Sequence, residues 1–258
     1  MAMFEYAIRA LMKQNQLRRK RLGILIYSDE GRDCRYSREK IEQASSLANN
    51  VIVLQQGSAS GNIVIGSRGI RKYQLLVEDK PRDLRPGTKA YDALRWTNLK
   101  TEAMMQLSSQ KDRLGVFVTG ISMKHFPMML PHRVQANILV SYYKSVSANK
   151  VEEDIHGILG KKGPKWRLNM VSDRPEMLAR RENRAYFNKI HEIAKELEIP
   201  ITHANSATPS VAGFVPKGVA VVCGLGPIVD SLHTPLEAVQ RVSLFQRTIL
   251  LAEILRKA

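Results

Sequence analysis

The stretch GVAVVCGLG, residues 218–226, contains only apolar residues and glycines. An uninterrupted apolar run of this length predicts a strand that is buried on both faces of a sheet. The next residues, PIVDSLHTPLEAV (227–239), bend the chain, and we predict an amphipathic helix over 235–257. A buried strand that leads into such a helix is typical of an α/β domain.

The two ends of the chain share this α/β pattern. From the spacing of apolar residues we predict a helix at 2–17, a strand at 23–28, a helix at 37–49, a strand at 50–54 and a long helix at 180–197. Alternating helices and strands indicate a sheet of the parallel type that is covered by helices.

Residues 68–174 have a different order of elements. The patterns predict β-α-β-β-α-β, with a loop rich in proline, glycine and charge at 80–87 and the first helix at 91–109. This is the order of a split βαβ, or ferredoxin-like, sandwich, and its length suits a domain. We therefore predict an α/β fold in which a discontinuous domain, residues 1–67 and 175–258, carries an inserted domain at 68–174.

Composition restricts the function and the compartment. The 258 residues carry a net charge of +16, with basic runs at 17–21, 161–167 and 179–184. No RNA-recognition, zinc-finger or helix-turn-helix pattern accompanies these runs, so we expect a basic surface rather than nucleic-acid binding. The sequence has neither a run of about 18 apolar residues for a membrane span nor the charge order of a signal peptide. Two cysteines, Cys34 and Cys223, imply no disulfide framework and favour a reducing, cytoplasmic location.

Four segments, taken in order, resemble a known family of enzymes. They are YSDEGRDCRYS (27–37), LPHRVQANILVSYY (130–143), SDRPEM (172–177) and GLGPIVDSLHTPLEAV (224–239). Their order and spacing are similar to those of the di-zinc metallopeptidase family of aminoacylases, glutamate carboxypeptidases and acetylornithine/succinyl-diaminopimelate deacylases. The resemblance covers nearly the whole chain. It implies a zinc-peptidase-like α/β domain with an inserted lid domain, through which two copies commonly form a dimer.

The chemistry that the resemblance implies needs two zinc ions, a bridging carboxylate and water, and a glutamate that takes the proton of the water. Glu30 matches this general base, and His233 matches the last zinc ligand. Gly31 and Gln55 replace two other ligands, and the upstream His-x-Asp and bridging Asp of the family have no counterpart in this chain. Asp29 is a further candidate ligand if the turn shifts by one residue. Because zinc sites need three or four protein ligands, we expect that zinc, the implied cofactor, is not bound tightly.

Two residues are candidates for substrate binding. Arg174 matches a carboxylate-binding arginine of the family, and a guanidinium can hold a carboxylate through two hydrogen bonds. His132 is a candidate because the family places a lid histidine in its active site, although that histidine comes from an earlier loop. Simpler structural roles stay open: an ion-pairing arginine, loop histidines at His132 and His233, and a loop acid at Glu30.

Three functions of different class remain open on the sequence. We favour a truncated or degenerate member of the zinc amidohydrolase/carboxypeptidase family that performs no di-zinc hydrolysis. It would be a scaffold that binds a peptide- or amino-acid-like ligand, or that forms a homodimer through the inserted domain. The first alternative is an active metallohydrolase of peptide or N-acyl amino acid bonds, with a site rearranged around His233, Asp29 and Glu30, with His203 or Asp230 nearby. The second alternative is a basic nucleic-acid-binding protein, and no membrane partner is expected.

Overall fold

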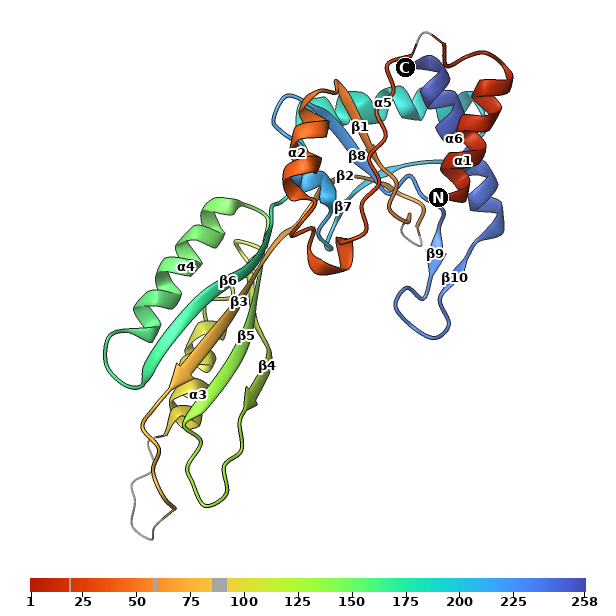
Figure 1. The fold of residues 1–258 in the computed structure, drawn as a ribbon. Coiled ribbons are helices and arrows are strands. Elements are labelled where there is room, and N and C mark those ends of the chain that lie inside the picture. Colours follow the sequence, from red (N-terminus) through yellow and green to blue (C-terminus); the bar gives the residue numbers. More distant parts are fainter. Residues whose placement is uncertain (19, 58–59, 85–91) are drawn as a thin grey trace. The chain divides into compact units, whose positions relative to one another are not determined.

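The computed structural model describes residues 1–18, 20–57, 60–84 and 92–258, and it divides into two compact units. One unit combines Met1–Ser67 with Met177–Ala258, and the other is Arg68–Glu176 (Figure 1). Residues 85–87 of the predicted loop and Tyr91 of the predicted helix lie outside the described residues. Among the described residues, no helix combines the length and the apolar character needed to cross a lipid bilayer.

The first unit is built on a mixed four-stranded sheet. Its strands are β1 (Asn50–Val53), β8 (Ala220–Cys223), β2 (Ile63–Ser67) and β7 (His203–Ser206), in the order β1-β8-β2-β7. The pairs β1–β8 and β2–β7 are parallel, but β8 and β2 are antiparallel where Val64 faces Cys223. The prediction of a parallel-type sheet is therefore wrong at this pair. The physical reason is that the connection from β1 to β2 is too short for a crossover, so β2 must return in the opposite direction.

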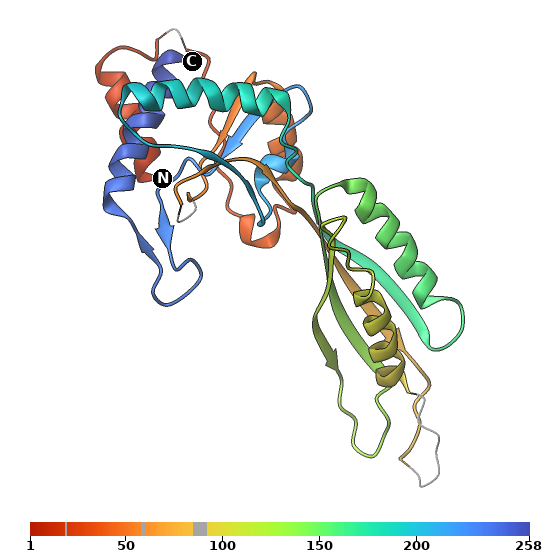
Figure 2. The same ribbon diagram turned by 180° about the vertical axis from the view of Figure 1, so that it is seen from behind.

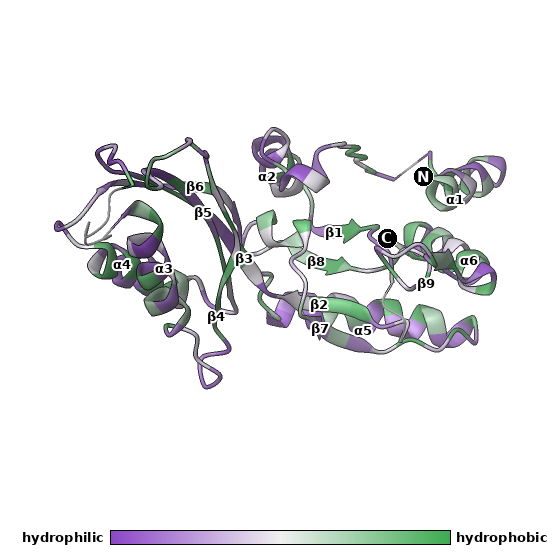
Figure 3. Cartoon of the chain, turned by 90° about the horizontal axis from the view of Figure 1, so that it is seen from below, coloured by the Kyte–Doolittle hydropathy of each residue, from purple (hydrophilic) through white to green (hydrophobic). Residues whose placement is uncertain are grey.

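The predicted apolar strand is the centre of this sheet. Every side chain of β8 is buried, and in Figure 3 the strand lies between β1 and β2 with hydrophobic colouring. Ala220 and Val222 pack with α5 (Arg181–Glu196) and α6 (Arg241–Lys257), while Val221 and Cys223 pack with α2 (Arg38–Ser46) and η2 (Val211–Phe214). This alternation follows from the two-residue period of a strand and buries both faces of the sheet.

A buried asparagine fixes α5 on the sheet. Asn183 is 0% exposed, and its Nδ2 donates to the carbonyl oxygens of Ile65 at 3.2 Å and Leu178 at 2.9 Å. Its Oδ1 accepts the backbone N–H of Val221 at 2.9 Å. One side chain thus satisfies backbone groups of β2 and β8 that the sheet leaves unpaired.

The first and the last helix of the first unit are both shorter than predicted. The first helix, α1, spans Ala2–Lys13 and packs on α6 through Met3, Ala7 and Leu251. The last helix begins only at Arg241, because Ala238 and Val239 pair with Asp230 and Val229 as strands β10 (Ala238–Val239) and β9 (Val229–Asp230). Thr234 and Glu237 close a turn between these strands, and this hairpin replaces the predicted first helical turns.

The predicted strand at 23–28 is also wrong. This stretch belongs to no strand of the structure. Its apolar side chains predicted burial, yet Ile24 is 56% and Ile26 is 66% exposed. The stretch forms no ladder with any of the described strands.

The second unit is an antiparallel sheet with two helices on one face. Its elements follow one another as β3 (Gly69–Glu78), α3 (Ala93–Met105), β4 (Gly115–Met123), β5 (Arg133–Tyr142), α4 (Ser145–Leu159) and β6 (Lys165–Arg174). The strand order is β4-β5-β3-β6, and all pairs are antiparallel. Trp96, Ile155 and Leu159 of the helices pack on Tyr73 and Ile138 of the sheet. The predicted mixed α/β architecture, with two main sheets, is confirmed.

A charged network lies within this second unit. Arg71 has a side chain that is 11% exposed, and its guanidinium lies 3.3 Å from both Glu152 and Asp173. The hydroxyl of Tyr73 donates to Glu152 at 3.1 Å, and that of Tyr142 donates to Asp173 at 3.0 Å. Burial raises the pKa of both tyrosines, and the neighbouring carboxylates raise it further. The hydroxyls therefore remain hydrogen-bond donors over the physiological pH range.

Candidate functional site

The turn before α2 is held by Asp29. Its carboxylate accepts the backbone N–H of Tyr36 at 2.8 Å, the N–H of Ser37 at 3.1 Å and the Ser37 hydroxyl at 2.5 Å. The Ser37 hydroxyl is the main cause that lowers the pKa of Asp29 below its usual value. Both oxygens of Asp29 therefore take part in shaping the turn that presents Glu30.

Four side chains meet beside this turn, and we call them the Gln55 cluster: Glu30, Gln55, Ser210 and Cys223. The amide of Gln55 donates through Nε2 to Glu30 Oε1 at 3.5 Å. Its Oε1 accepts the Ser210 hydroxyl at 3.2 Å and the Cys223 thiol at 3.0 Å. Ser210 and Cys223 are each 3% exposed, whereas Glu30 and Gln55 are half-buried. The cluster thus joins two buried weak donors to an amide and a carboxylate that solvent can reach.

The topology of the first unit places this cluster at one edge of the sheet. Cys223 is the last residue of β8, and Gln55 follows the end of the parallel strand β1. Ligands in α/β sheets commonly bind at the carboxyl ends of parallel strands. The cluster is therefore a candidate ligand site by position as well as by chemistry.

Sequence reasoning missed part of this cluster. Ser210 and Cys223 were not candidate site residues, and Gln55 entered only as a lost zinc ligand. Ser210 carries a local signal, since its Oγ caps η2 by accepting the N–H of Ala212 at 3.1 Å. Gln55 carries another, because it is a polar residue just after the apolar stretch Val51–Leu54.

His233 lies in the β9–β10 hairpin. Its φ is +64°, and its backbone N–H donates to Glu237 Oε2 at 2.7 Å. The hairpin extends away from the sheet in both Figure 1 and Figure 2. Within the described residues, no group of three or more His, Cys, Asp or Glu side chains could hold a metal ion. The structure therefore brings Glu30 and Gln55 together and assigns His233 to the hairpin.

The two candidate substrate residues belong to the second unit. Arg174 ends β6 and is 5% exposed, and its carbonyl oxygen accepts the Tyr142 hydroxyl at 3.5 Å. His132 is 7% exposed, with Nδ1 at 3.3 Å from the carbonyl oxygen of Leu130 and its ring 4.5 Å from that of Phe126. The contacts of the His132 side chain thus lie within its own unit.

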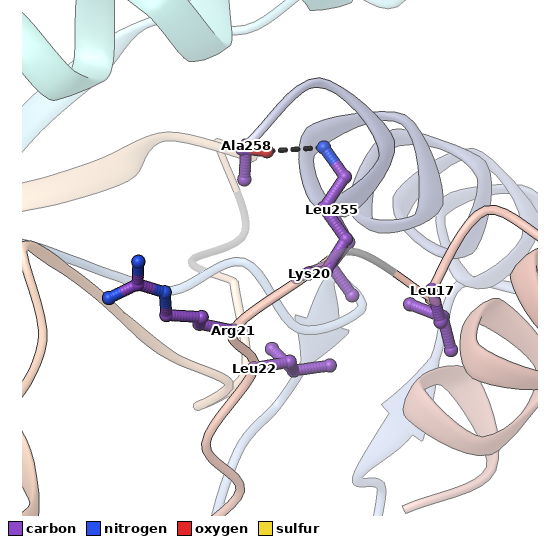
Figure 4. Close-up of a pocket in the computed structure, with 6 residues that line it drawn as sticks. All are labelled: Leu17, Lys20, Arg21, Leu22, Leu255 and Ala258. Atoms are coloured by element: carbon purple, nitrogen blue, oxygen red, sulfur yellow. Dashed lines mark hydrogen bonds between the residues drawn. The ribbon is translucent and has the colours of Figure 1, made fainter.

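A small pocket lies elsewhere in the first unit. It has a volume of about 70 Å³ and lies between the end of α6 and the segment after α1 (Figure 4). The Lys20 ammonium donates to the carbonyl oxygen of Ala258 at its wall. The pocket is lined by Leu17, Lys20, Arg21, Leu22, Leu255 and Ala258, and none of these is a candidate site residue.

Comparisons with known proteins support the fold. Neither a family model nor a curated protein matches this sequence. Among solved structures, aminopeptidase PepT from Bacillus cereus has a TM-score of 0.68 at 16% identity, over 97% of this chain and 68% of that one. A tripeptidase from Staphylococcus aureus has a TM-score of 0.64 at 12% identity, over 86% of this chain and 62% of that one. An amidase of the hydantoinase/carbamoylase family from Burkholderia vietnamiensis has a TM-score of 0.59 at 13% identity, over 80% of this chain and 53% of that one.

These similarities define the class of fold. The chain has a fold similar to that of peptidases and amidases, and the resemblance that the sequence suggested is confirmed at this level. The chain spans between about half and two thirds of the length of these structures. Identities this low establish the architecture alone, so the activity must be argued from the site.

Proposed function

We propose that this chain is a degenerate relative of the zinc amidohydrolases and carboxypeptidases that binds a peptide- or amino-acid-like ligand without di-zinc hydrolysis. The observation that carries this proposal is the hydrogen bonding of Gln55. A neutral amide stands where the family resemblance implies an anionic ligand, and its oxygen already accepts two hydrogen bonds. The donor set does not fit a pair of divalent cations, which prefer anionic or imidazole ligands.

The other candidate ligands support the same proposal. Both Asp29 oxygens accept hydrogen bonds from the turn, so using Asp29 on a metal would cost those bonds. Glu30 lies beside a neutral amide, and a general base needs an activated water to deprotonate. The cluster instead offers a carboxylate and an amide, which can bind an ammonium group and a peptide group. Independently of this cluster, the family resemblance makes Arg174 of the second unit a candidate for binding a ligand carboxylate.

The experiment that tests this proposal combines metal analysis with ligand binding. The purified protein is incubated with zinc, dialysed and analysed for metal, and amide hydrolysis is followed on a dipeptide and an N-acetyl amino acid. We expect well under one zinc per chain and no hydrolysis, but binding of one of the two probes by calorimetry. Glu30→Gln should weaken this binding, while Glu39→Gln, at an exposed glutamate of α2, should not. About two zinc ions per chain together with hydrolysis would establish the active metallohydrolase instead.

We also propose that the second unit is a ferredoxin-like lid domain that forms a homodimer. Its edge strand β4 exposes apolar side chains, with Phe117 50%, Ile121 41% and Met123 50% exposed. An exposed apolar edge strand favours pairing with another strand. Light scattering should show a dimer that Phe117→Lys dissociates, whereas Val146→Lys, on the exposed face of α4, should leave it intact. A monomeric parent protein at high concentration would refute this assignment.

A further inference from the structure

The segment Leu22–Ile26 is an apolar stretch that the described structure leaves exposed. Ile24, Leu25 and Ile26 are 56%, 45% and 66% exposed. It belongs to no helix or strand, and its backbone forms no hydrogen bond with the backbone of any other described residue. An isolated Leu or Ile at a surface is ordinary, but three consecutive ones have the composition of a strand that lacks its neighbour.

The same side of the first unit carries an open sheet edge. β1 is the terminal strand of its sheet and pairs only with β8 among the described strands. Figure 3 shows the segment between α1 and α2 running on the side of β1 that is opposite β8. Val51 and Ile52 of β1 are only half-buried. An edge with unpaired N–H and C=O groups and apolar side chains is a template for an added strand.

The chemistry around this edge specifies the occupant. Arg18 and Arg21 are exposed and directly precede the apolar segment, so acidic residues beside an incoming strand would be attracted. α6 of the same unit carries a second exposed apolar row, with Val242 68%, Phe245 63% and Ile249 52% exposed. These features favour a polypeptide partner over a small ligand.

We propose that β1 and Leu22–Ile26 form a docking edge for a β-strand supplied by another polypeptide, an apolar strand flanked by acidic residues, which completes the sheet of the first unit. The added strand would form main-chain hydrogen bonds with the edge and bury the side chains of Ile24 and Ile26. This interaction is independent of the ligand proposed for the Gln55 cluster.

A synthetic peptide tests this proposal directly. The probe is a fluorescent peptide with alternating Val and Thr over five residues and two Glu at each end, titrated with the full chain at low salt and followed by anisotropy. We expect saturable binding that weakens as salt rises. A peptide with a central proline should bind at least tenfold more weakly, because proline removes a ladder donor. Hydrogen exchange should show protection of the amides of Leu22–Ile26 in the complex.

Matched variants separate the docking edge from general adhesion. Leu25→Pro and Ile24→Lys should each weaken peptide binding at least tenfold, with circular dichroism and melting temperature unchanged. Leu47→Lys, at an apolar residue that is 90% exposed after α2, should bind like the parent. Equal binding of the proline peptide, or unchanged binding by Leu25→Pro, would overturn the proposal. A dimer that Leu25→Pro dissociates and Phe117→Lys does not would also overturn it, because a second copy would then occupy the edge.

Discussion

Gln55→Glu is the most informative single change, because it restores the anion that the family resemblance implies. The new carboxylate would lie about as far from Glu30 as the present amide, 3.5 Å. Two unit charges at this distance repel by roughly 2–5 kcal/mol at the effective dielectric constants of half-buried sites. Proton uptake and side-chain movement relieve part of this repulsion. The expected net loss at neutral pH is therefore about 2 kcal/mol, or roughly 4–8 °C in melting temperature for a chain of this size.

The pH dependence follows from the same repulsion. The neighbouring charge raises the pKa of the new carboxyl in the folded protein above its unfolded value. The variant should therefore approach the parent in stability at low pH, where this carboxyl is protonated in both states, and lose stability as pH rises towards 7. Urea unfolding at several pH values measures this difference, with Gln56→Glu at the exposed neighbouring residue as the matched control. A Gln55→Glu protein that is as stable as Gln56→Glu at pH 7 would refute the proposed geometry of the cluster.

Three further changes test the packing and the charges of the two units. Asn183→Ala leaves backbone groups of Ile65 and Val221 unpaired. Urea unfolding should therefore show a loss of about 2–4 kcal/mol in the free energy of unfolding. Asn188→Ala, at an exposed residue of the same helix, should show almost no loss. Arg71→Met leaves Glu152 and Asp173 without their shared cation and should lower the free energy of unfolding by about 3 kcal/mol. Arg133→Met breaks only an exposed ion pair and should lower it by under about 1 kcal/mol. Asp29 has a lowered pKa, so it stabilises the fold above its unfolded pKa of 3.8 and loses this contribution as pH falls. The stability difference between the parent and Asp29→Asn should therefore shrink during acid titration, and a constant difference would contradict this role.

The sequence predicts a helix or strand correctly where its local hydrophobic pattern agrees with the burial of the side chains in the structure. The apolar run at 218–226 contains β8, whose side chains fill cores on both faces of the sheet. The apolar face of α5 recurs with helical spacing at Tyr186, Phe187, Ile190 and Ala194, and the same spacing packs it on the sheet. In such elements the hydrophobic period itself determines which side chains are buried.

The sequence-based prediction is wrong where an apolar run has no strand to pair with, and where a turn forms in place of a helix. Leu22–Ile26 has the composition of a buried strand, but strand formation requires a neighbouring strand that a local pattern cannot reveal. At 235–240 the spacing suits a helix, yet Ala238 and Val239 pair across the hairpin, and backbone pairing of this kind overrides propensity.

The candidate site was the least predictable part, because its members are brought together by tertiary structure alone. Ser210 and Cys223 contact Gln55 across 155 and 168 residues of sequence. The resemblance to a zinc family directed attention to carboxylates and histidines, whereas the residues that meet at the sheet edge are an amide, a hydroxyl and a thiol. Only the topological rule for the ends of parallel strands could have indicated Gln55 and Cys223 together.

The two cores of the first unit are built from apolar side chains, and they do not include the polar side chains of the Gln55 cluster. Both cores of the sheet are closed by apolar side chains of α5, α6, α2 and η2, and Asn183 satisfies the backbone groups between β2 and β8. The Gln55 cluster lies at the end of the strands and joins the cores only through Cys223. The loss of metal ligands that we propose for that edge would therefore open no cavity in either core.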